Sequence, residues 1–413
     1  MTKDFKIWTL SNGLKAMHKK INSPVAHCCM MIKTGTRHEA KNENGLAHFI
    51  EHCLFKGTET KSAHTVLNKL DNLGGEINAY TTKEETCIYA TFLISDFDAA
   101  MDLVADITFK ATFPSKEIER EKTVIIDEIH AYRDSPSEEI FDRFEEILFP
   151  NHPLGRDILG TEESVNQFTS DDCKRFLKRN YSIENIIFAS IGNISISEVN
   201  ARLEKWFQKH PITNQLSTTR KRTAFETQNQ LNHVMEREVS QTHVMLGQRA
   251  YPLTDSRRTP LFLLNNILGG PAMNSLLNMA VREKNGYTYT IESNYSSYSD
   301  TGLWHVYFGS DNKSADKCMY LVIKELKKLM STPLSTNKLA QAKKQLLGQV
   351  AIARDNGNAL MLSAAKNQLF LGFADDFDAL QTKIEIITAH ELMQVANDIF
   401  DPEKMVTLTF KSA

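Results

Sequence analysis

The sequence predicts an α+β protein built from two homologous domains of similar size. Three observations lead to this prediction. The chain has 413 residues, which is more than one domain of ordinary size needs. In its first half, β-rich runs alternate with long helical patterns. After a polar stretch the same order of elements returns, so we interpret the chain as an internal duplication of a unit of about 200 residues.

The polar stretch sets the expected domain boundaries. His210-Pro211 opens a run rich in Thr, Ser, Asn and Gln that has no hydrophobic periodicity. Such a composition is typical of a linker, because it offers little apolar surface to bury. We therefore predict an N-terminal domain over residues 1–208, a linker over 209–230 and a C-terminal domain over 231–413.

The elements of the first half are predicted from turn signals and hydrophobic periodicity. The turn Ser11-Asn12-Gly13 joins two strands as a hairpin. Pro136 interrupts the long helical pattern that follows Pro114, because proline removes a backbone donor. The predicted strands are 5–10, 14–21, 25–34, 77–80, 87–92 and 186–191, and the predicted helices are 44–56, 62–73, 95–110, 115–148, 171–179 and 197–207.

The second half repeats this plan. A β-rich run over 232–248 is followed by two helices around Gly269-Gly270, and further strands lie between 287 and 309. The last strand, 405–410, corresponds to 186–191 in the first half. The predicted helices are 255–268, 272–284, 313–330, 335–354, 358–371 and 389–400.

Composition and charge exclude several classes of protein. Hydrophobic residues make up 41% and charged residues 24%, which is ordinary for a globular protein. A net charge of −3 does not indicate a nucleic-acid-binding protein, because such proteins usually carry an excess of basic residues. No apolar run is long enough for a membrane span, and the first eight residues resemble neither a signal nor a transit peptide. The six cysteines form no C-x-x-C pair, so we expect reduced, buried thiols in a cytoplasmic, bacterial-type protein.

The stretch Gly45–Gly57 carries the strongest chemical signal. It places His48 and His52 four residues apart with Glu51 between them. On a helix these three side chains fall within an arc of about 100°. Two imidazoles on one face can bind the same zinc ion, and the carboxylate beside them can act on the water of the metal. The order H-x-x-E-H is that of the inverted zinc peptidases.

A third ligand would separate a metal site from the alternative, an amphipathic helix whose histidines only cap a surface. Catalytic zinc takes three protein ligands, and two histidines with one glutamate form an established set. The helix expected after Pro114 offers several carboxylates on or near one face. Spacing alone does not choose among Glu121, Asp127, Glu128 and Asp134.

The motif resembles that of a known family. His48, Glu51 and His52, followed after 75 intervening residues by Glu128, are similar to the zinc-site residues of the pitrilysin, insulinase and mitochondrial processing peptidase family, in its short bacterial form. Other stretches match in order over nearly the whole chain. They include Thr34-Gly35-Thr36-Arg37, Lys56-Gly57-Thr58, Gly74-Gly75, His152-Pro153-Leu154-Gly155, Leu268-Gly269-Gly270 and the run from Arg282 to Tyr289. Cys53, Pro271 and Leu276 depart from the usual residues of the family.

The resemblance implies a metal site and its chemistry. His48, His52 and Glu128 would hold one Zn²⁺ per chain, and Glu51 would be the general base on the zinc-bound water. Glu121 would orient a ligand histidine from the second shell. From the residues alone, Glu121 could equally be a surface carboxylate.

The resemblance also implies a substrate site. Asn78 and Ala79 would lie on a strand edge that takes up peptide by β-addition. Arg282 and Tyr289 would form a pair that contacts the substrate near the scissile bond, with the Tyr289 hydroxyl stabilising the oxyanion. Without the resemblance, Asn78 is a turn-adjacent polar residue, and Arg282 and Tyr289 are a helix-end charge and a strand aromatic.

The implied protein is a zinc-dependent metalloendopeptidase with a processing-peptidase-like fold, in which a mostly antiparallel sheet of each domain packs with helices. It would hydrolyse peptides or unfolded segments in an enclosed chamber. Family chambers contain four such domains, so we expect a homodimer, or a heterodimer with a homologous chain, and neither nucleic acid nor membrane as a partner. The alternative is a non-catalytic or partner-dependent scaffold subunit, which the intact zinc set and Arg/Tyr pair disfavour.

Overall fold

The computed structural model describes residues 4–207, 223–226, 230–374 and 376–412. These residues form two compact units. The first comprises residues 1–131, 152–224 and 353–376, and the second comprises 132–151, 225–352 and 377–413. The predicted linker, 209–230, falls mostly outside the described residues.

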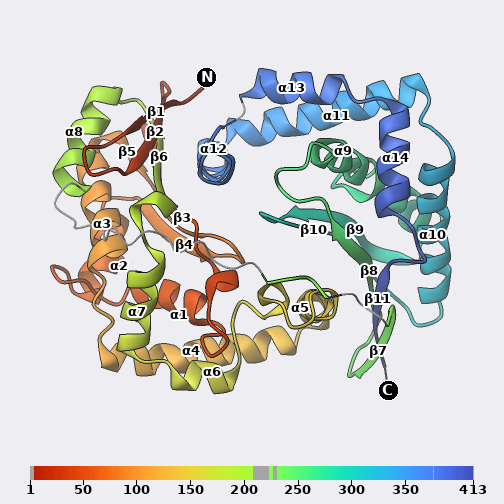
Figure 1. Cartoon of the computed structure of the whole chain (residues 1–413), viewed down its shortest axis with the longest axis horizontal. Helices are drawn as coiled ribbons and strands as arrows, with labels where there is room; N and C mark the ends of the chain where they lie inside the picture. Colours follow the sequence, from red (N-terminus) through yellow and green to blue (C-terminus); the bar gives the residue numbers. More distant parts are fainter. Residues whose placement is uncertain (1–3, 208–222, 227–229, 375, 413) are drawn as a thin grey trace. The chain divides into compact units, whose positions relative to one another are not determined.

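The first unit is built on a six-stranded sheet (Figure 1) with the order β1-β2-β6-β3-β5-β4. Only β2 and β6 pair in parallel, and the other neighbours are antiparallel. Edge strand β4 is the last in this order. The strands are β1 Lys6–Thr9, β2 Lys15–Lys20, β3 Val25–Ile32, β4 Glu76–Thr81, β5 Thr86–Leu93 and β6 Ile186–Gly192.

Both faces of the central strands of this sheet, β3 and β6, are buried. Along β3, Cys28 and Met30 point into the larger core, where the helices from the first half of the sequence pack. Cys29 and Met31 point into a smaller core on the opposite face, which also holds Met361. Because alternate residues point to opposite faces and both faces are buried here, the strand ends in a continuous apolar run, Cys28–Ile32.

The helices of the first unit come from both halves of the chain. The helix that packs on the smaller core is α12, which belongs to the second half of the sequence. The helices are α1 Leu46–Leu54, α2 Ala63–Asp71, α3 Phe97–Lys110, α4 Ser115–Arg133, α6 Glu162–Gln167, α7 Ser170–Asn180, α8 Ile196–Phe207 and α12 Gly357–Leu371. Short 3₁₀ turns lie at η1 Thr36–His38, η2 Ile94–Asp96, η3 Pro153–Gly155 and η4 Ile183–Asn185.

The second unit repeats the sheet of the first. Its order is β7-β11-β8-β10-β9, in which β7 and β11 are parallel and the other pairs are antiparallel. Strand for strand this matches β2-β6-β3-β5-β4, so the internal duplication and the mostly antiparallel sheets are confirmed. The strands are β7 Asn232–Arg237, β8 Thr242–Ala250, β9 Thr288–Ser297, β10 Gly302–Ser310 and β11 Val406–Ser412.

The second unit takes its covering helix from the first half of the sequence. That helix is α5, whose Phe141 packs edge to face on His305 of β10. The apolar core lies between the other face of the sheet and the remaining helices. The helices are α5 Pro136–Leu148, α9 Arg258–Gly269, the π-helix η5 Asn278–Glu283, α10 Ala315–Ser331, α11 Thr336–Asp355, α13 Phe377–Glu385 and α14 Ala389–Ile399.

Three elements differ from the sequence prediction. The helix expected over 272–284 is shorter, and its last part is the π-helix η5, because the residues after Gly270 form bends and turns. The short helices α6 and α13 were not predicted. Each has about two turns, which is too short for a hydrophobic period to stand out. No helix in the described part of the chain has the length and apolarity to cross a membrane.

Candidate metal centre

Helix α1 presents the motif residues at the border of the core. Phe49, Ile50 and Leu54 are fully buried and pack the helix into the core of the first unit. Cys53 is buried there as well, as its position round the helix predicts. His48 is largely buried, whereas Glu51 and His52 are partly exposed. The apolar face thus fixes the helix, and the motif side chains lie along its edge.

Three side chains converge beside α1. His48 Nε2 lies 3.8 Å and His52 Nε2 lies 3.6 Å from Oε2 of Glu128, which comes from α4. One candidate ligand atom from each residue lies within 4.8 Å of the other two. Of the four carboxylates that spacing left open, Glu128 is the one that the fold brings to both histidines.

These separations suit one zinc ion. Atoms about 2.0–2.1 Å from a tetrahedral metal lie about 3.3 Å from one another, so small side-chain adjustments would bring all three within bonding distance. Burial, together with the smaller effect of the neighbouring His52, lowers the pKa of His48 to about 3. A neutral imidazole is the form that binds a metal. The donor set and its spacing therefore fit Zn²⁺.

Glu51 lies beside this group without belonging to it. One carboxylate oxygen, Oε2, is buried and has no hydrogen-bond partner among the described residues. Burial raises the pKa of Glu51, while a hydrogen bond with Thr81 and the nearby His52 oppose the increase. A raised pKa suits a carboxylate that must both accept and return a proton.

Glu121 contacts one of the candidate ligands. Its Oε2 lies 3.3 Å from Nδ1 of His52, the ring nitrogen that points away from Glu128. Its Oε1 lies 2.7 Å from Nζ of Lys56. Only 4% of Glu121 is exposed, so both contacts form in a largely dry environment. This places Glu121 where a partner for a metal-binding histidine stands in zinc sites.

Glu39 supports the start of α1, and sequence reasoning missed it. The helix begins after Gly45, whose φ of +89° lies in the left-handed region. Because glycine has no side chain, Gly45 cannot accept a hydrogen bond from the first amides of the helix. Glu39 takes over this role, because its two oxygens accept hydrogen bonds from the amides of Gly45 (3.0 Å) and Ala47 (2.8 Å). Burial raises the pKa of Glu39 to about 8. A helix start without a capping residue is the signal that could have revealed it.

Asn78 and Ala79 lie on edge strand β4, which packs beside α1. They pair with Tyr89 and Ile88 of β5, so the opposite edge of β4 pairs with no described strand. Asn78 is exposed and Ala79 is partly buried. The position at a sheet edge is the one that β-addition requires.

Arg282 and Tyr289 lie in the second unit, on the neighbouring elements η5 and β9. The Arg282 guanidinium lies 3.7 Å from Glu283, and its side chain is 44% exposed. Tyr289 is 87% exposed, which is unusual for a large aromatic residue. Both side chains are therefore accessible on their own unit.

Comparison with known proteins decides the family. The model of the insulinase family, peptidase family M16, matches residues 15–162, and that of the peptidase M16 inactive domain matches residues 167–346. An uncharacterized zinc protease of Bacillus subtilis is 31% identical over 406 residues, which are 98% of this chain and 97% of that protein. The chain belongs to the insulinase family of peptidases. An uncharacterized zinc protease of Streptomyces coelicolor is also 31% identical, over 95% of this chain and 86% of its own.

Solved structures show the same fold. A protease from Helicobacter pylori superposes with a TM-score of 0.90 at 20% identity, covering 100% of both chains. A peptidase M16 inactive domain from Pseudomonas fluorescens gives a TM-score of 0.90 at 20% identity, covering 99% of this chain and 98% of that one. The two-domain M16 fold inferred from the sequence is thereby confirmed.

Proposed function

We propose that the protein is a zinc-dependent endopeptidase that hydrolyses peptides or unfolded polypeptide segments in an enclosed chamber. The convergence of His48, His52 and Glu128 carries the proposal, since two histidines and a glutamate form a known catalytic zinc set. Family membership and relatives named zinc proteases support it at the level of a zinc peptidase.

Each site residue has a distinct part in this proposal. A bound zinc ion supplies a Lewis acid that polarises the peptide carbonyl and acidifies the attacking water. Glu51 takes a proton from that water and returns it to the leaving amine. Its partnerless buried oxygen and raised pKa support this role. Glu121 orients His52 through Nδ1.

Substrate binding is assigned to two further pairs. Asn78 and Ala79 would hold an extended peptide against the free edge of β4, which favours unfolded segments over folded proteins. Arg282 and Tyr289 would contact the substrate near the scissile bond and stabilise the oxyanion. Their exposure supports a role outside the core of their own unit.

We further propose a homodimer, or a heterodimer with a homologous chain, in which Arg282 and Tyr289 serve the zinc site of the partner. Neither nucleic acid nor membrane is proposed as a partner, and the cytoplasmic location stays a prediction. The six buried, free cysteines are compatible with a reducing compartment.

A digest of mixed peptides tests the proposed activity. The purified chain is incubated with unstructured peptides and with a folded protein, and the products are identified by mass spectrometry. We expect internal cleavage of the peptides alone, loss of cleavage with a chelator, and recovery when zinc is added back. Cleavage that survives complete metal removal would disprove the zinc mechanism. A chain with zinc bound but no cleavage of any peptide would favour the scaffold function.

A further inference from the structure

We propose that Lys56 is a positioning residue of the metal centre, which fixes the Glu121 carboxylate so that this carboxylate holds the His52 ring. The inference rests on the proposed zinc site. In the sequence, Lys56 opens one of the stretches that match the family, but the pattern assigns it no role. Its contacts point to one.

A continuous chain of polar contacts runs from Lys56 to the candidate ligand atoms. Lys56 Nζ lies 2.7 Å from Oε1 of Glu121, and the other oxygen, Oε2, lies 3.3 Å from Nδ1 of His52. On the far side of that ring, Nε2 lies 3.6 Å from Glu128. Each oxygen of Glu121 thus has one partner. A rotation of the carboxylate that kept one contact would break the other.

The chain of contacts has a chemical consequence for His52. A carboxylate at Nδ1 accepts a hydrogen bond from this nitrogen, so the proton of the neutral ring is held at Nδ1. The lone pair then lies on Nε2, the nitrogen that faces Glu128 and is suited to a metal. Lys56 acts on this choice of tautomer only through Glu121.

The backbone around Lys56 is fixed. Lys56 follows the C-terminal end of α1, and its amide donates a hydrogen bond to the Cys53 carbonyl (3.1 Å). The carbonyl of the next residue, Gly57, accepts a hydrogen bond from the Thr112 amide (3.1 Å). Gly57 has a φ of +125°, a conformation that disfavours side chains.

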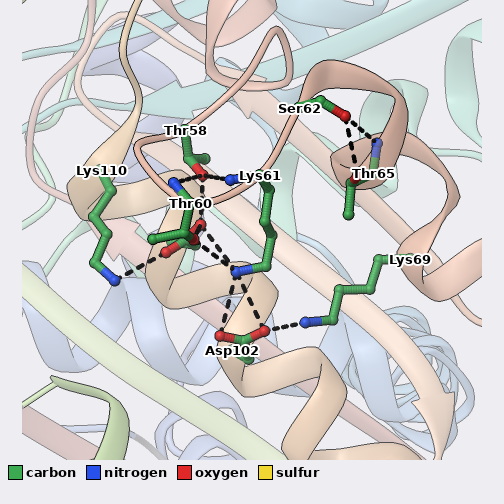
Figure 2. A network of polar contacts seen from close by, with 9 residues as sticks. Thr58, Thr60, Lys61, Ser62, Thr65, Lys69, Asp102 and Lys110 are labelled. Carbon is green, nitrogen blue, oxygen red and sulfur yellow. Dashed lines mark hydrogen bonds and ion pairs between the residues drawn. The ribbon is translucent and has the colours of Figure 1, made fainter.

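The residues that follow are tied to α3 by a polar network (Figure 2). Thr58 Oγ1 donates to the buried Asp106 (2.5 Å), and Lys61 Nζ lies 3.0 Å from the same carboxylate. Lys61 also lies 3.2 Å from Asp102. The turn that carries Lys56 is therefore held at both ends. This fixes the backbone of Lys56 at a position from which its side chain reaches Glu121.

The positive charge of Lys56 would by itself have the opposite effect on zinc affinity. A positive charge near a cation site repels the metal, so a lysine that acted by charge alone would weaken zinc binding. Lys122 offers a matched control. It follows Glu121 on α4 but pairs with Glu119 at 2.8 Å, so its removal also deletes a positive charge without touching the Glu121 carboxylate.

The test measures zinc affinity by competition with a chromophoric chelator. Variants Lys56→Met, Lys56→Arg and Lys122→Met are each made in the wild-type and in the Glu121→Gln background. We expect Lys56→Met to weaken zinc binding about tenfold, as loss of outer-shell partners does. Lys56→Arg should retain most of the affinity, and Lys122→Met should leave it unchanged. In the Glu121→Gln background, Lys56→Met should cause no further loss.

Three results would overturn the inference: unchanged binding in Lys56→Met, tighter binding in Lys56→Met, or an equal loss in both backgrounds. If the wild type itself binds no zinc, the proposed function fails instead. A second readout then still tests Lys56: nitrogen-15 NMR of the His52 ring in the metal-free protein. We expect the Nδ1–H tautomer in the wild type and a mixture of tautomers in Lys56→Met and in Lys56→Gln. The same tautomer in all three would overturn the inference.

Discussion

The imidazole rings of His48 and His52 lie 4.7 Å apart, edge to face at 64°, one turn apart on α1. Both Nε2 atoms lie within 4 Å of the same Glu128 oxygen. This arrangement needs no unusual backbone, because residues four apart on a helix share one face. The burial of the opposite face of α1 decides where that pair of rings is held.

Replacing Glu51 by Gln should abolish peptidase activity while zinc still binds. The amide keeps the shape of the side chain but cannot take a proton, and general base catalysis contributes about 10²–10⁴-fold. Peptide cleavage and zinc content are measured on the same preparation. Glu59→Gln, an exposed glutamate on the segment after α1, serves as the control and should behave as wild type. Near-normal turnover in Glu51→Gln would remove Glu51 from this role.

Replacing Asp106 by Asn should destabilise the first unit by about 2 kcal/mol, since a buried, hydrogen-bonded carboxylate becomes a neutral amide with a single acceptor oxygen. Asp106 is 1% exposed and lies 3.0 Å from both Lys61 and Lys110. Urea denaturation measures the change. Asp98→Asn is the control on the same helix, because its partner Arg202 lies 3.5 Å away at the surface. Equal stabilities of the two variants would contradict the role of the network.

The same carboxylate predicts a pH dependence. Burial alone would raise the pKa of Asp106, but hydrogen bonds from Thr58, Thr60, Lys61 and Lys110 outweigh it and lower the pKa below the ordinary 3.8. A depressed folded-state pKa means that the folded protein binds fewer protons than the unfolded chain. The stabilisation is therefore complete above about pH 4 and is lost as the pH falls further. The difference in stability between wild type and Asp106→Asn should shrink below pH 4, and a constant difference would refute this assignment.

Replacing Glu39 by Gln should destabilise the protein by about 1–2 kcal/mol, the usual cost of losing a helix cap. Above pH 8, where Glu39 is ionised, the carboxylate offers two acceptor oxygens and a glutamine offers one. At that pH, one of the amides of Gly45 and Ala47 therefore loses its partner in the variant. Hydrogen exchange of these two amides, together with urea denaturation, measures the effect. Unchanged protection of both amides would show that Glu39 does not hold the start of α1.

Mixing two inactive variants should restore activity if the dimer proposal is right. A Glu51→Gln chain retains Arg282, and an Arg282→Ala chain retains Glu51, so a mixed dimer contains one complete site. At equal amounts and random pairing, about a quarter of the wild-type activity is expected. Co-purification with two different tags establishes that mixed dimers form. Mixed dimers without recovered activity would contradict the supply of Arg282 by the partner.

The parts of the fold that could be predicted are those whose signals are local. His48 and His52 stand out because four-residue spacing on an amphipathic pattern is visible within a single turn. The repeated sheet could be inferred because each β-rich run recurs in order in the second half. Glu128 was different, since periodicity left four carboxylates open and only the resemblance singled out one.

The contacts that could not be predicted join residues far apart in sequence. Lys56 and Asp106 act through partners that only tertiary structure brings near them. The same holds for α5 and α12, each of which packs on the sheet formed by the other half of the sequence. An amphipathic helix shows which face it buries, but the sequence does not name the surface that receives it.

Zinc titration of the metal-free protein tests the central claim most directly. Isothermal titration calorimetry compares the wild type with Glu128→Gln and with Asp127→Asn, the exposed neighbour on α4. We expect one zinc ion per chain in the wild type and in Asp127→Asn. Binding should be weakened by at least about a hundredfold in Glu128→Gln, which lacks one of the three proposed ligands. Zinc binding by Glu128→Gln with wild-type affinity, or no zinc binding by the wild type, would contradict the account.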